Sequence, residues 1–167
     1  MRPEDEPFLR DLQAQVDSER LGLQYWSQES VELAQKILAQ QYNAHSAYYR
    51  TVKNNWDTKD CIIELEGKAV GRFIVTQGAE EIYLAEIAVD RAHRGKGLGQ
   101  AVIEATKSEC VQSKRVLRLR VDVHNSAIHF YLGLGFAPLE QQQTHVLMEW
   151  VPPNLQGRKL HFSPQQG

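Results

Sequence analysis

The chain has 167 residues, 42% of them hydrophobic and 24% charged, and a formal net charge of −2 at pH 7. This composition predicts one folded domain with a buried core and excludes an intrinsically disordered chain. It gives no basic field for nucleic acid or an anionic membrane, and no apolar run approaches the ~20 residues of a membrane helix. The opening "MRPEDEPFLRDL" is unlike a signal peptide, and the two cysteines, Cys61 and Cys110, form no metal or disulfide pattern. We therefore expect a cytoplasmic protein with reduced thiols and no metal.

The first half of the chain is predicted to form two helices and a hairpin. Helical spacing of apolar residues indicates a helix over "EDEPFLRDLQAQV". A second helix is predicted to begin at Ser27 or Ser30, with one apolar side made of Val31, Ala34, Ile37, Leu38 and Tyr42. Two β-type runs then flank Glu66-Gly67-Lys68, which is typical of a short hairpin.

The second half alternates strands and helices. Strands are predicted in "EIYLAEIAV", "RVLRLRVDV" and "HVLMEW", with a helix from Val102 to about Ser113 and a short helix in "SAIHFYLGLGF". This order gives a mixed α/β arrangement with one βαβ crossover at its centre. We expect residues 1–152 to form a single domain and residues 153–167, rich in Pro, Gly and Gln, to form a loosely ordered tail.

The most unusual stretch is "RAHRGKGLGQA", residues 91–101, where a predicted strand meets a predicted helix. A helix start has N–H groups without partners and a partial positive charge, and glycines let a ligand approach the backbone, so this turn favours an anion such as phosphate. A tight turn with positive φ is the alternative, although one glycine would suffice for it. The Walker and dinucleotide motifs fail at Gly97 and Gln100. What remains is Arg-x-x-Gly-x-Gly, formed by Arg94, Gly97 and Gly99.

This pattern resembles the signature of the GNAT superfamily of acyl-CoA-dependent N-acyltransferases. "LAEIAVDRAHRGKGLGQAVIEA" is similar to its central strand, pyrophosphate loop and helix, and "RVDVHNSAIHFYLGLGF" to its second signature; "PEDEPFLRDL" and "LMEW" resemble the opening and close of one bacterial branch. The resemblance implies an α/β (α+β) fold whose mixed, mostly antiparallel sheet splays between two parallel strands, with helices on both faces. Members usually begin with a strand before "PEDEP", which would be absent or shortened here.

The resemblance also implies acetyl-CoA as co-substrate and a set of binding residues. The backbone of Ile87, Ala88 and Val89 would pair with the pantetheine arm. Asn125 would bond the same arm, and Tyr131 would lie beside the thioester sulfur as a general acid. The pyrophosphate would be held by the N–H groups of the loop, namely Arg94, Gly95, Lys96, Gly97, Leu98, Gly99 and Gln100.

Each catalytic candidate has a structural alternative. Glu86, a carboxylate on the central strand beside Leu84 and Ala88, is either the general base or the partner of Arg118 or Arg120 in an ion pair.

Tyr131 is either the acid or a core tyrosine, and His124 is either a second base or a loop residue. His93 and Lys96 either touch the adenosine phosphates or are solvated. An aromatic cluster either borders the acceptor site or packs in the core, and comprises Tyr42, Tyr48, Tyr49 and Trp56.

We therefore expect an N-acetyltransferase that moves an acetyl group from acetyl-CoA to a primary amine by direct attack in a ternary complex. The alternative is a non-catalytic acyl-CoA-binding sensor or scaffold. The sequence leaves the acceptor open among small amines, antibiotics, amino acids and proteins, and it leaves open a second copy of the chain as a partner.

Overall fold

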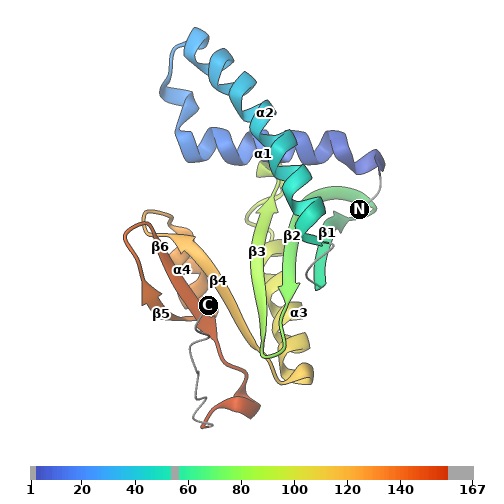
Figure 1. Cartoon of the computed structure of the whole chain (residues 1–167), viewed down its shortest axis with the longest axis vertical. Helices are drawn as coiled ribbons and strands as arrows, with labels where there is room; N and C mark the ends of the chain where they lie inside the picture. The colour runs from blue at the N-terminus through green and yellow to red at the C-terminus, as the bar shows by residue number, and fades with distance from the viewer. Residues whose placement is uncertain (1–2, 54–56, 158–167) are drawn as a thin grey trace.

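The computed structural model describes residues 3–53 and 57–157, with backbone alone for Pro3 and residues 43–53 (Figure 1). Its helices are α1 (Glu6–Leu21), α2 (Gln28–Lys53), α3 (Leu98–Ser113) and α4 (Ala127–Gly133). Its strands are β1 (Asp57–Leu65), β2 (Lys68–Gln77), β3 (Glu81–Val89), β4 (Val116–Asp122), β5 (Ala137–Gln141) and β6 (His145–Trp150). In this part of the chain no strand precedes α1, and short 3-10 turns occur at Pro3–Asp5, Leu23–Tyr25, Arg91–His93 and Pro153–Leu155.

The six strands form one mixed sheet in the order β1-β2-β3-β4-β6-β5, which confirms the predicted fold class. Every neighbouring pair is antiparallel except β3 and β4, the two strands joined by the α3 crossover. The predicted hairpin joins β1 to β2, and its turn residues Glu66 and Gly67 both have positive φ, as a two-residue hairpin turn of the favoured hand requires.

Strand β5 was not predicted. Its five residues, Ala137–Gln141, are all exposed and include Pro138. It lies at the edge of the sheet, where a proline is tolerated and no buried face imposes alternation. Its sequence therefore carries none of the usual strand signals.

The main hydrophobic core lies between the sheet and the helices α3 and α4. Ile82 and Leu117 from β3 and β4 pack there with Ile103 of α3 and Met148 of β6, all fully buried. The opposite face of the sheet is covered by α1 and α2, which Figure 1 shows crossing one end of the sheet. Strand β3 therefore contacts α3 on one face and, towards one end, α1 on the other.

Helix α2 differs from its predicted pattern at one position. Val31, Ala34 and Leu38 are half-buried and Tyr42 is buried, but Ile37 keeps 47% of its surface exposed. Figure 1 shows why, because the first turns of α2 extend beyond the sheet and α1 alone lies beside them.

A β-bulge in β3 changes which face its side chains occupy. Leu84 pairs with Val75 and Glu86 pairs with Ile74, so Ala85 is an extra residue in the ladder. Directly opposed residues of an antiparallel pair share a face, and a bulge resets the alternation. Leu84 and Val75 belong to the core on the α3 side, whereas Glu86 lies on the α1–α2 side with Ile74.

The C-terminal segment begins with an ordered turn. Leu155 is buried, and the Asn154 side chain donates a hydrogen bond to the Val111 carbonyl at 3.0 Å. Residues 158–167 lie outside the described chain, so the loosely ordered tail stays a prediction.

Both cysteines are free, and burial raises the pKa of the Cys110 thiol to about 11. Within residues 3–53 and 57–157, no helix has the length and hydropathy to cross a membrane, and no group of side chains has the composition of a metal site.

Candidate active site

The two parallel strands separate part of the way along. Residues Glu81–Leu84 of β3 pair with Val116–Leu119 of β4, and the pairing then stops. Strand β3 continues to Val89 with β2 as its partner on one side, and β4 continues to Asp122 with β6 as its partner. The predicted splay is therefore present, and it leaves the β4-facing edge of Ala85–Val89 without a strand partner. We call this segment the open end of β3.

The glycine loop follows the open end directly. Gly95 and Gly97 have φ of +73° and +77°, and a Cβ added at either would meet nothing within 4 Å. Gly97 is the N-cap of α3, so no side-chain hydrogen bond caps the helix. Positive φ therefore explains two of the three glycines, and the open space beside them leaves the first N–H groups of α3 accessible to an anion.

Arg94 is held on the side of the loop that faces α1. Its Nε donates to the Val89 carbonyl at 2.8 Å, and its Nη1 contacts both carboxylate oxygens of Glu19 at 3.0 and 2.8 Å. Arg91 donates to the same carboxylate through Nε and Nη2 at 3.0 and 2.8 Å. Burial raises the pKa of Glu19, but the hydrogen bonds from Arg91 and Arg94 outweigh it and lower the pKa below its usual value.

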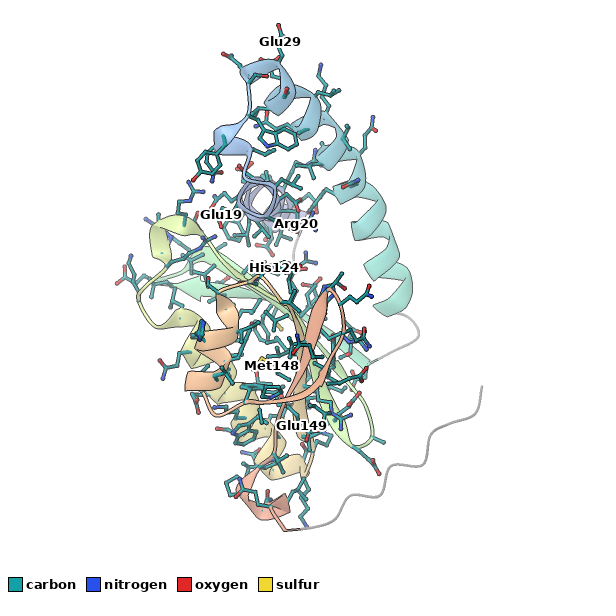
Figure 2. The ribbon with its side chains drawn as sticks, turned by 90° about the vertical axis from the view of Figure 1, so that its left-hand side faces the viewer. Glu19, Arg20, Glu29, His124, Met148 and Glu149 are labelled. Atoms are coloured by element: carbon teal, nitrogen blue, oxygen red, sulfur yellow. The ribbon has the colours of Figure 1, made fainter. Side chains whose placement is uncertain are left out.

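This clamp of Glu19 by two arginines joins α1 to the loop, and Figure 2 shows Glu19 on the side of α1 nearest the loop. The Asp90 carboxylate adds to the junction, with Oδ1 accepting from Gln15 at 2.9 Å and Oδ2 lying 2.8 Å from His93 Nδ1. The sequence pattern did not indicate this clamp, since Glu19 and Arg94 are 75 residues apart. His93 is therefore paired with Asp90, and Lys96 is exposed.

Glu86 lies on the open end of β3 and is paired with Arg72 of β2, not with Arg118 or Arg120, the partners named in the structural alternative to a general base. Its Oε1 is 3.9 Å from Arg72 Nη1, and 22% of its side chain is exposed. Arg118 contacts Glu81 and Glu149 instead, each at 2.7 Å. The expected partner was wrong because β3 and β4 part at Leu84, before Glu86 is reached.

Tyr131 lies on α4 and packs edge-on against Phe130 and Phe136, with ring centroids 5.3 and 5.7 Å away. The residue is 8% exposed, and burial raises the pKa of its hydroxyl. Within the described chain the hydroxyl has no hydrogen-bond partner, and its oxygen is not fully buried. A protonated phenol therefore reaches the surface there. Ile87 of the open end packs against the same cluster.

Helix α4 is fixed at both ends. The Asn125 Oδ1 accepts from the Ala127 N–H at 2.9 Å, which forms an Asx turn just before the helix. At the other end the buried Lys107 donates to the Leu134 carbonyl at 2.6 Å. The Asn125 oxygen is thus occupied, while its side-chain nitrogen makes no hydrogen bond within the described residues.

His124 follows β4, is exposed, and lies at the α1 end of the molecule (Figure 2). Of the aromatic cluster, Tyr42 is buried and lies under Arg10, whose Cζ is 5.8 Å from the ring centroid. The side chains of Tyr48, Tyr49 and Trp56 lie outside the described residues.

Comparison with known proteins agrees with this geometry. Residues 57–138 match the model of the acetyltransferase (GNAT) domain. The PaiA N-acetyltransferase of Thermoplasma acidophilum, solved in complex with coenzyme A, superposes with a TM-score of 0.68 at 16% identity, over 90% of this chain and 95% of that one. An acetyltransferase of Thermus thermophilus superposes with a TM-score of 0.64 at 20% identity, over 90% and 93%. No curated protein matches the sequence.

The ribosomal-protein-S18-alanine N-acetyltransferase of Escherichia coli is similar over a shorter span, with a TM-score of 0.52 at 25% identity over 63% of this chain and 75% of that one. A splayed sheet, a glycine loop at the start of α3 and the family match define an acetyl-CoA-dependent acetyltransferase. The chain therefore contains a GNAT acetyltransferase domain over residues 57–138.

Proposed function

We propose that the protein transfers the acetyl group of acetyl-CoA to a primary amine by direct attack within a ternary complex. The observation that carries the proposal is the end of β3–β4 pairing at Leu84 and Leu119, directly before the open glycine loop. The pantetheine arm would take the place of a strand along Ile87, Ala88 and Val89. The pyrophosphate would lie against the N–H groups between Gly95 and Gln100. Binding both reactants together removes much of the entropic part of the barrier.

The two faces of the sheet offer one proton-transfer group each. Glu86 lies on the face covered by α1 and α2, and Tyr131 belongs to the cluster on the α3 side. An amine approaching from the first face would meet a carboxylate able to accept its proton, directly or through water. A thiolate leaving towards the second face would meet a phenol that burial keeps protonated. This separation suits a base and an acid that act on opposite sides of one carbonyl.

The chemistry balances with these two groups once the proton gained by Glu86 has left to solvent and solvent has returned a proton to the Tyr131 phenolate, before the next turnover. The amine nitrogen attacks the thioester carbonyl and loses a proton to Glu86. The tetrahedral intermediate then collapses, the C–S bond breaks, and the thiolate takes a proton from Tyr131. A backbone N–H near Val89 would polarise the carbonyl oxygen during attack. The products are the N-acetyl amine and free CoA.

An acceptor panel tests the proposal, with release of the CoA thiol as the readout. The panel contains small primary amines, free amino acids, antibiotics with amino groups, and peptides with free N-termini or lysines. Structural neighbours justify two of these classes, because one neighbour is a nourseothricin acetyltransferase and another an S18-alanine N-acetyltransferase. We expect CoA release that depends on one class of amine. Tight acetyl-CoA binding with no turnover on any class would contradict acetyl transfer and favour an acyl-CoA sensor.

A further inference from the structure

A buried ionic network connects Glu86 to the neighbouring strands. Arg72 of β2 donates to Asp60 of β1 through two nitrogens, Nε to Oδ1 and Nη2 to Oδ2, each at 3.0 Å. Its third nitrogen, Nη1, lies 3.9 Å from Glu86 Oε1. The side chains of Asp60 and Arg72 are each 8% exposed. One guanidinium therefore joins two carboxylates, but by unequal contacts.

The inequality has a geometric cause. A bidentate grip on a carboxylate uses the planar fork of a guanidinium and fixes its orientation. Asp60 takes that fork, so Arg72 can turn no further towards Glu86. The remaining contact is longer than a hydrogen bond, which for N–H···O lies near 2.7–3.2 Å. Arg72 Nη1 thus attracts the Glu86 carboxylate electrostatically but donates no hydrogen bond to Oε1.

The pKa of Arg72 indicates that its guanidinium is charged within this network. Burial alone lowers the pKa of Arg72, but the hydrogen bond to Asp60 and the charges of Glu86 and Asp60 raise it above its usual value. Tyr42 of α2 lies close enough to contribute in the same direction, and Arg10 of α1 lies over its ring. Among the described residues, the titratable groups that act on Arg72 are therefore Asp60, Glu86 and Tyr42.

We propose that Arg72 is a positioning residue that holds Glu86 on the acceptor face, and that Asp60 keeps Arg72 from pairing fully with it. This inference rests on the proposed role of Glu86 as general base. Without Arg72 the carboxylate loses the cation that lies 3.9 Å from its Oε1. Without the charge of Asp60 the guanidinium is free to turn towards Glu86 and weaken it as a base. Changes at the two positions therefore have opposite effects on the ionisation of Glu86.

The test is a titration of the Glu86 carboxyl carbon by NMR in full-length protein labelled with 13C-glutamate, the signal being assigned with Glu86→Gln. Asp60→Asn should move the titration midpoint to lower pH by about one unit, because an uncompensated cation favours the carboxylate. The double variant Asp60→Asn/Arg72→Met should move it to higher pH, because the cation is gone. The double variant leaves no buried charge unpaired between these two positions and so protects the fold.

The matched control is Glu149→Gln, which removes one carboxylate from the second network, Glu81–Arg118–Glu149. It should leave the Glu86 midpoint unchanged. Midpoints that move the same way in both test variants, or not at all, would overturn the positioning role.

Turnover separates this inference from the proposed function. With the acceptor found by the panel, the rising limb of kcat against pH should move with the NMR midpoint in each variant. If Glu86→Gln abolishes that limb but the network variants leave it in place, the base stands and the positioning role falls. If Glu86→Gln keeps the wild-type limb and rate, both the base and the positioning role fall, while acetyl transfer itself is still measured by CoA release.

Discussion

The two ends of β3 carry the same kind of ionic network in opposite arrangements. At the paired end, Arg118 of β4 contacts Glu81 of β3 and Glu149 of β6, so charges cross the junction between the parallel strands. At the open end, Arg72 of β2 contacts Asp60 of β1 and Glu86 of β3, so these charges join the three strands on the other side of β3. No ion pair of the described residues joins Glu86 to β4.

The difference shows how one strand serves two purposes. Charges that cross between β3 and β4 tie the sheet together where both strands are hydrogen-bonded. Charges directed away from β4 leave the open end unobstructed, and they place a carboxylate beside it. In Figure 2 Glu149 lies far from α1, whereas His124, just after β4, lies beneath it. We propose that stability and chemistry occupy opposite ends of the β3–β4 pair, and the following substitutions test that division.

The largest effect is expected in the loop at the open end. Gly97→Asp should reduce affinity for acetyl-CoA by at least about a hundredfold, because a carboxylate would repel the pyrophosphate and displace charge-assisted hydrogen bonds of roughly 1.5–3 kcal/mol each. Calorimetry measures the change. Gly67→Asp is the control, since Gly67 has the same φ of +77° and the same open surroundings, but lies in the β1–β2 turn. If the two folded variants bind acetyl-CoA with equal affinity, the glycine loop is not part of the binding site.

Carboxylates at the two ends of β3 should behave differently when neutralised. Glu86→Gln should lower kcat by about 10²–10⁴-fold, the usual contribution of a general base, with acetyl-CoA affinity nearly unchanged. Glu149→Gln should leave kcat within about twofold and instead lower the free energy of unfolding, by roughly 1–3 kcal/mol for a broken charged hydrogen bond. Steady-state kinetics and urea unfolding of both variants give the comparison. If Glu86→Gln lowers the free energy of unfolding but keeps the wild-type kcat, Glu86 has only a structural role, as proposed for Glu149.

Much of this division could be predicted from the sequence, and the rest depends on bulges and long-range contacts. The crossover, the hairpin at Glu66–Gly67 and the glycine loop have local signals, namely alternation, turn residues and a strand-to-helix junction. The Asp60–Arg72 contact does not. Counting back from the turn without a bulge pairs Arg72 with Cys61, and so puts Asp60 on the other face; the actual register pairs Arg72 with Ile62.

A bulge also explains why the sequence does not show which face of the sheet Glu86 occupies. Regular alternation would place Glu86 on the same face as Leu84. A bulge is a one-residue shift whose cause lies in the packing of both strands, and the sequence of one strand does not contain it. The sequence nevertheless indicates Glu86 as an acid on the central strand, where a carboxylate is costly unless paired or used, and its catalytic role stays a prediction.

A smaller effect is expected at the acid. Tyr131→Phe should lower kcat by about tenfold to a hundredfold, less than a full general acid supplies, because we expect departure of the thiolate to limit the rate only in part. Burial raises the pKa of Tyr131 above its ordinary value of 10.0. The phenol therefore stays protonated as pH rises through the neutral range, and wild type should show no falling limb below about pH 10 from this group. If kcat of the wild type falls near pH 8 and this fall is absent in Tyr131→Phe, the phenol does not stay protonated and the prediction is wrong.

The smallest effect is expected where α1 meets the loop. The pKa of Glu19 is lowered in the folded protein, so its ion pairs stabilise above the unfolded pKa and are lost as pH falls through the folded value. Glu19→Gln should cost roughly 0.2–1 kcal/mol at pH 7, as for exposed ion pairs. The difference from wild type should shrink as pH falls below the ordinary glutamate value of about 4.3, since the stabilisation is lost between that value and the lower folded pKa. Thermal unfolding at pH 7 and pH 3.5 measures it, and a constant difference would exclude the charge of Glu19 as the cause.

Hydrogen exchange with and without acetyl-CoA tests the division of β3 most directly, because it follows each half of the strand in one experiment. We predict that acetyl-CoA slows exchange of backbone N–H groups at Ile87–Val89 and at Gly97–Gln100, and leaves Glu81–Leu84 unchanged. Protection at the open end would mean that the ligand supplies the partner that β4 does not. Binding that protects neither the open end of β3 nor the glycine loop would contradict this division of the strand.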